Sequence, residues 1–229
     1  MIETTQTYKD LLQNPNSWKE TRLLISGEEY KQDRIVSVRQ NNPLFAGNTF
    51  SIGGAVSATL DVVIRKPGLI PKMAEIKPFF RLTDGETTSE WVPKGVFFID
   101  TRRPDNENDI LTIRAFDAML RAEQIWEPDQ SLTFPMSHRA TVIILAQVFG
   151  VKMENPEEIS DSYYVDYPTD DYTIRQVLRF IAGANGGNFV ISNLGNLRFV
   201  GVNKLLPETR YLVDQHGNSI TFGGVRILV

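Results

Sequence analysis

The segment from Trp91 to Gln124 constrains the fold more than any other part of the chain. It contains two runs of β-branched and aromatic residues, 96–101 and 110–116, separated by a polar cluster of turn-forming residues at 104–109. The second run alternates apolar and polar side chains, so the two runs together predict a β-hairpin. Strong helix formers follow Asp117, whose side chain can cap a helix, so the chain is expected to leave a sheet and start a helix there.

Short β-type segments fill the region between about residue 20 and residue 116, and about six of them, with turn signals between, predict a small sandwich or barrel. The clearest is 55–65, which predicts a single half-buried antiparallel strand. Gly53 and Gly54 precede it, and we favour a bulge or bend there over a phosphate-binding loop, because the Lys and Ser/Thr of a P-loop are missing. The apolar residues that alternate along 55–65 are Val56, Ala58, Leu60, Val62 and Ile64.

Helical periodicity and helix caps follow the first hairpin. Thr173 and Gln176 occupy the two positions of a capping box, in which each side chain satisfies a free amide of the first helical turn. Apolar residues then recur with the 3.6-residue period of one helix face. These signals predict helices at about 118–124, 138–149 and 173–184, followed by a second hairpin at 188–202.

The predicted elements divide the chain into three parts. Residues 1–117 are expected to form an N-terminal β-barrel or sandwich with a helical arm at its start. Residues 118–210 are expected to form a smaller α/β domain. Residues 211–229 return to β character and would either start a second barrel or close the first. The expected fold class is therefore α+β and mostly β.

Composition excludes several classes of function. No cysteine is present, so disulfides, thiolate metal ligands and a thiol nucleophile are excluded. The longest unbroken apolar run is Val142–Ala146, far shorter than the roughly 20 residues that cross a bilayer, so no membrane span is expected. The net charge of -4 disfavours the broad basic surface of nucleic-acid-binding proteins, and no specific nucleic acid partner is expected.

Candidate catalytic residues are few. His138 and His216 are far apart in the sequence and belong to no metal-binding motif, so both are expected to be surface histidines. Paired carboxylates could in principle cleave glycosides. A cap explains Asp117, however, and the polar face of a strand explains Asp61. The candidates for such a pair are Asp61, Asp100, Asp117 and Glu123.

The acidic segment, residues 153–172, contains seven carboxylates, four tyrosines and no Lys or Arg. Oxygen ligands suit a hard cation, so one hypothesis is a Ca²⁺ site. The spacing and the central glycine of an EF-hand are missing, and we favour a solvated connection between two helices whose tyrosines pack their rings and leave their hydroxyls in water. The ligands of the hypothetical site would be Asp161, Asp166, Asp170 and Asp171.

Three tryptophans, Trp18, Trp91 and Trp126, could line a sugar-binding site. Each is in or beside an apolar stretch, which favours a role in the core. With this, each candidate has a structural explanation, and no catalytic, cofactor-binding or metal-binding residue is assigned.

Four stretches carry a resemblance to a known family. They are WVPKGVFFID at 91–100, LTIRAFDAMLRAEQ at 111–124, TIRQVLRFIAGANGGNFVIS at 173–192 and GNLRFVGV at 195–202. In this order and at these separations they resemble the tail hub proteins of phages and prophages, which include the baseplate hub of contractile tails and the N-terminal hub part of siphophage tail-associated proteins. The resemblance implies a tail-tube-like barrel interrupted by a smaller α/β insertion and followed by a second barrel, which would only begin within this chain.

The resemblance also implies a function. It implies a virion structural protein of the tail tip or baseplate, located in the virion tail after synthesis in the bacterial host cytoplasm. The implied partners are further copies of the chain, as a trimer in the family, together with the tail tube or distal tail protein, the tape measure, and spike or fibre proteins. It carries no catalytic residues, so an enzyme is not expected. Two alternatives are a carbohydrate-binding module for host adhesion and, with less support, a cell-wall hydrolase.

Overall fold

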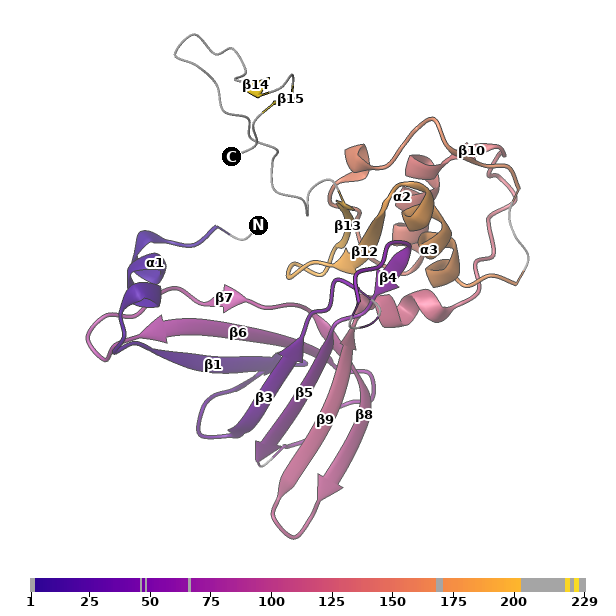
Figure 1. Ribbon diagram of the computed structural model, residues 1–229. Helices are drawn as coiled ribbons and strands as arrows, with labels where there is room; N and C mark the ends of the chain where they lie inside the picture. Colours follow the sequence, from indigo (N-terminus) through magenta and orange to yellow (C-terminus); the bar gives the residue numbers. More distant parts are fainter. Residues whose placement is uncertain are drawn as a thin grey trace.

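The computed structural model describes residues 3–45, 47, 49–65, 67–167 and 171–202, and the backbone of 221–222 and 225–226. Two clusters of buried apolar side chains organise these residues, one inside a large sheet and one beneath the helices (Figure 1). Antiparallel strands dominate and helices are few, which confirms the predicted mostly β, α+β class.

A large antiparallel sheet encloses the first core. Within the described residues it has eight strands, in the order β2-β1-β6-β8-β9-β5-β3, with β7 paired to β6. The predicted first hairpin is β8–β9, and its turn is shorter than expected because β8 continues through Asp105. The strands are β1 (Trp18–Ile25), β2 (Glu28–Tyr30), β3 (Ile35–Asn41), β5 (Thr59–Arg65), β6 (Glu75–Thr83), β7 (Val92–Pro93), β8 (Phe97–Asp105) and β9 (Ile110–Asp117).

The sheet bends sharply where β6 meets β8. These two strands pair at Glu75–Phe98 and Ile76–Phe97, whereas β1 and β6 pair along their whole length. Figure 1 shows the result: β1 and β6 turn away from β3, β5, β9 and β8, so the sheet folds around its own core. Because β2 and β3 end the strand path, the predicted barrel or sandwich is an open, folded sheet within the described residues.

The second core lies in a smaller α/β unit. A three-stranded sheet, β13-β12-β4, carries helices α2 and α3 and the 3-10 helix η1. The predicted arm at the start of the chain is helix α1 (Gln6–Gln13). The elements of the smaller unit are β4 (Gly54–Val56), η1 (Ala118–Glu123), β10 (Met136–Ser137), α2 (His138–Val148), η2 (Pro156–Glu158), β11 (Tyr164–Val165), α3 (Ile174–Ala184), β12 (Gly187–Ile191) and β13 (Leu197–Gly201).

The strand predicted over 55–65 is split in two, β4 and β5. Its alternating apolar side chains are buried as predicted. The split was not predicted, because an alternating pattern indicates which side chains are buried but not which neighbouring strand each residue pairs with. β4 pairs in parallel with β12, whereas β5 pairs with β3 and β9. The chain changes sheets at Ser57 and Ala58, where the Asp117 carboxylate accepts a hydrogen bond from the Ala58 amide at 2.7 Å.

Strand β8 contributes to both cores. Phe97 and Ile99 belong to the core of the large sheet, and Phe98 between them belongs to the core of the smaller unit. Successive side chains of a strand point to opposite faces, so one strand can serve both. The Arg121 guanidinium of η1 lies 3.8 Å from the centre of the Phe98 ring and covers it.

The helix predicted at 118–124 forms as the 3-10 helix η1 and begins at the predicted cap, since the Asp117 side chain accepts from the Met119 amide at 3.0 Å. It ends early because Gln124 is extended and Ile125 bridges to Thr173.

The predicted C-terminal part, 211–229, lies largely outside the described residues. Within it, β14 (Thr221–Phe222) pairs antiparallel with β15 (Val225–Arg226). The predicted second barrel therefore stays a prediction.

Replacing Thr173 by Ala tests the start of α3. The capping box is present: Thr173 Oγ1 accepts from the Gln176 amide at 3.2 Å, and Gln176 Oε1 accepts from the Thr173 amide at 2.8 Å. Loss of the hydroxyl should lower the free energy of unfolding by about 1 kcal/mol, measured by urea denaturation. Thr173→Ser keeps the hydroxyl and is the matched control; equal stability of the Ala and Ser variants would contradict the assignment.

Candidate functional site

The four candidate carboxylates do not form one cluster. Asp61 lies on β5, with Arg114 Nε 3.9 Å away. Asp100 and Glu123 line a common groove, in which Arg175 bridges Glu123 and the carbonyl oxygen of Ala55. The structure thus places Asp100 and Glu123 along the same groove, and the Glu123 carboxylate is paired with the Arg175 guanidinium.

Asp117 has a structural role. Its side chain accepts hydrogen bonds from the Ser57 hydroxyl at 2.8 Å, the Ala58 amide at 2.7 Å and the Met119 amide at 3.0 Å. The residue is only 3% exposed. Burial raises the pKa of the Asp117 carboxyl to about 6, although its hydrogen bonds and the more distant charge of Arg175 oppose the rise. This carboxyl fastens the sheet change at Ser57 to the start of η1.

His138 is buried, so the expectation of a surface histidine is wrong for this residue. It is 9% exposed, its Nδ1 lies 3.1 Å from Asn185 Nδ2, and the Tyr163 ring packs against it edge to face. Pairing of β10 with β11 brings Tyr163 over the imidazole, a contact between segments that local sequence does not encode. Burial lowers the pKa of the His138 imidazole. His216 lies outside the described residues.

The hypothetical Ca²⁺ ligands are not assembled in the described part of the chain. Asp161 pairs with Arg139 and accepts from the Ser137 hydroxyl at 3.3 Å. Asp170 lies outside the described residues. Among the residues that are described, no three His, Cys, Asp or Glu side chains are placed to hold one metal ion. The acidic segment is anchored by buried Ile159 and exposes its tyrosines, including Tyr167 at 75%.

The three tryptophans have different surroundings. Trp126 is 2% exposed in the core of the smaller unit, as predicted. Trp91 contacts the guanidinium groups of Arg22 and Arg81, whose central carbon atoms lie 4.6 and 4.4 Å from the centre of the ring. Trp18 is 51% exposed, so its predicted core role is wrong. The tryptophans therefore do not line one sugar site.

The glycine pair forms the predicted bend. Gly53 has a positive φ of 80°, and a Cβ there would lie 3.4 Å from the Cα atom of Gly183 in α3. The Gly54 amide donates to the side-chain oxygen of buried Asn188 at 2.7 Å. Glycine is needed because the backbone approaches a helix closely in a conformation that L-residues rarely adopt.

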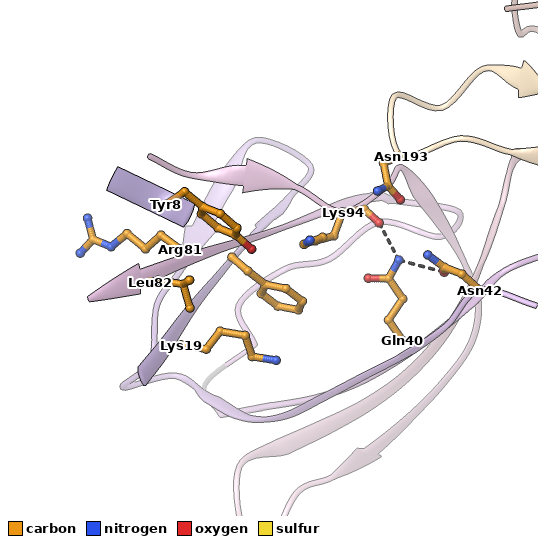
Figure 2. Close-up of a pocket in the computed structure, with 9 residues that line it drawn as sticks. Tyr8, Lys19, Gln40, Asn42, Arg81, Leu82, Lys94 and Asn193 are labelled. Atoms are coloured by element: carbon orange, nitrogen blue, oxygen red, sulfur yellow. Dashed lines mark hydrogen bonds between the residues drawn. The ribbon is translucent and has the colours of Figure 1, made fainter. Parts of the chain in front are cut away.

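One polar groove was missed by the sequence reasoning, and we call it the basic groove (Figure 2). It combines α1, β1, β6, the end of β3, the residues after β7 and the β12–β13 turn. Because each segment supplies only one to three residues, no local motif signals it. Its lining residues are Tyr8, Lys19, Gln40, Asn42, Phe80, Arg81, Leu82, Lys94 and Asn193.

Two lysines dominate the basic groove. The ammonium nitrogens of Lys19 and Lys94 lie 4.3 and 5.9 Å from the centre of the Phe80 ring. Figure 2 shows that their side chains reach into the groove from different segments, Lys19 from β1 and Lys94 from the residues after β7. Burial lowers the pKa of the Lys94 ammonium, and the charge of Lys19 lowers it further. None of the lining residues is acidic, so the groove suits an anionic group.

The described helices include none that is long and apolar enough to cross a membrane.

Comparison with known proteins gives matches among solved structures. No protein-family model matches the chain, and no curated protein matches it. The 43 kDa tail protein of prophage MuSo2 from Shewanella oneidensis is similar with a TM-score of 0.52 and 14% identity, over 80% of this chain and 53% of its own. The tail protein from Neisseria meningitidis MC58 is similar with a TM-score of 0.55 and 15% identity, over 88% of this chain and 58% of its own.

These matches show a shared fold. This chain spans 53% and 58% of the two tail proteins, so each has a substantial part with no counterpart here. The shared fold agrees with the resemblance to phage tail proteins found in the sequence.

Replacing Asp117 by Asn tests the buried carboxyl. The amide keeps the shape but has one acceptor atom instead of two, so at pH 4 the free energy of unfolding should fall by about 1–3 kcal/mol. The raised pKa means that the protonated carboxyl favours folding: this contribution is complete below the ordinary pKa of 3.8 and is lost as the pH rises through about 6. The Asn side chain does not titrate, so the stability of the variant lacks this contribution to the pH dependence.

Urea denaturation at several pH values between 4 and 7 measures the effect. The stability difference between wild type and Asp117→Asn should shrink as the pH rises, by up to roughly 3 kcal/mol. A difference that stays constant over this range would contradict the raised pKa of Asp117.

Proposed function

We propose that this chain is a structural protein of a phage or prophage tail, acting at the tail tip or baseplate as a hub that links the tail tube to a spike or fibres. The observation that carries the proposal is the fold shared with two tail proteins over 80% and 88% of the chain. The four sequence stretches that resemble tail hub proteins support the hub role.

The described geometry suits a protein that acts through its surfaces. The buried carboxyl Asp117 and the buried His138 are occupied in holding segments together. The tryptophans have separate surroundings, which gives the carbohydrate-binding alternative no common site among the described residues. We propose no enzymatic role for the chain.

The proposal includes partners and location. The partners are further copies of the chain, the tail tube or distal tail protein, the tape measure, and spike or fibre proteins. The location is the virion tail, after synthesis in the cytoplasm of the bacterial host. We also retain the proposed boundary at residue 117, with β4 reaching from the first part of the chain into the sheet of the second.

Particles from a host that carries the gene test this function. An epitope-tagged chain should copurify with tails, and gold-labelled antibody should mark one end of each tail in electron microscopy. A tagged host protein of similar size, expressed from the same promoter, is the control for trapped material. Absence of the chain from purified tails would contradict the tail role, and labelling along the whole tube would contradict the hub position.

A further inference from the structure

The basic groove holds two cations without counter-charges. In the described part of the chain, the ion pairs involve neither Lys19 nor Lys94. Lys94 is partly buried, and removing an ammonium group from water without a partner is costly. An anionic occupant would offset this cost, and the Phe80 ring between the lysines offers an apolar surface beside it.

The groove is built by contacts that fix its shape. Gln40 Nε2 donates to the carbonyl oxygen of Lys94 at 2.6 Å and to Asn42 Oδ1 at 2.9 Å (Figure 2). Asn193, in the turn between β12 and β13, lies at the rim. The large sheet and the smaller unit thus shape the groove together.

The acidic segment of the same chain has the complementary chemistry. Glu157 and Asp166 are exposed, and within the described residues neither forms a hydrogen bond or an ion pair. Tyr164 and Tyr167 are exposed beside them. Tyrosine rings bury much area at interfaces for a small loss of side-chain entropy, so this segment can supply carboxylates and rings together.

We propose that the acidic segment of one copy binds in the basic groove of a second copy. Within one chain, β10 and its partner strand in the acidic segment lie at the opposite end of the molecule from α1 and the groove (Figure 1). The contact is therefore between copies and joins two different surfaces. Because each copy has both surfaces, successive copies can bind in the same way, and they form either a closed ring or an open chain of subunits. It deepens the proposed function, because it specifies the self-association on which that function rests.

Complementary charge reversals test the contact. The groove variant carries Lys19→Glu and Lys94→Glu, and the segment variant carries Glu157→Lys and Asp166→Lys. A control variant with Lys72→Glu and Arg179→Glu makes the same charge change as the groove variant, at exposed positions outside the groove. The oligomeric state of each is measured by sedimentation velocity at low and high salt.

The wild type and the control should self-associate, more weakly at high salt because ions screen the contact. The groove and segment variants should each lose at least about tenfold in self-affinity. Mixed together, they should associate again, because the acidic segment of the groove variant meets an unchanged groove and the reversed groove meets a reversed segment. Restored association also shows that both variants are folded, and carbodiimide cross-links between Lys19 or Lys94 and the acidic segment should map the contact.

Three results would overturn the proposal: a monomeric wild type, variants that each associate like the wild type, or lost association that mixing the two variants does not restore. If the groove variant fails to fold, Lys19→Gln with Lys94→Gln replaces it in the same mixture. Failure of this contact leaves the tail role standing if the tagged chain still marks the tail end, so the two proposals fail separately.

Discussion

The hydrogen bonds of the Asp117 carboxyl are the constraint on which the rest of the structure depends. They join the end of β9 and the start of η1 to Ser57 and Ala58, where the chain passes from one sheet to another. Asp117 is buried at this junction, and its burial raises the pKa of the carboxyl, because the charged form is less favourable away from water.

The sheet change places residues that are distant in the sequence into one sheet. β4 pairs with β12, and the Gly54 amide reaches the side chain of Asn188. β8 also connects the two parts, because Phe98 packs in the core of the smaller unit while Phe97 and Ile99 pack in the core of the large sheet. The position of the smaller unit then decides where the β12–β13 turn lies, and so completes the basic groove.

Local signals predicted the local structure well. The hairpin after Trp91, the cap at Asp117 and the capping box at Thr173 each depend on neighbouring residues, and each is present. The pairing between strands is not encoded locally. The alternation over 55–65 predicted the burial of its apolar side chains, but it could not show that this stretch forms two strands that pair with different neighbours. The burial of His138 depends on Tyr163, and the basic groove on six separate segments, so neither has a signature in the sequence.

Hydrogen exchange followed by mass spectrometry in increasing urea tests most directly whether Asp117 makes the two cores one cooperative unit. Amides of β5 and β9 report on the large sheet, and those of α3 and β12 on the smaller unit. In the wild type both sets should exchange with the same free energy of opening and the same dependence on urea, and in Asp117→Ala they should separate. Two different opening free energies in the wild type, or a common one retained in Asp117→Ala, would contradict the role assigned to this carboxyl.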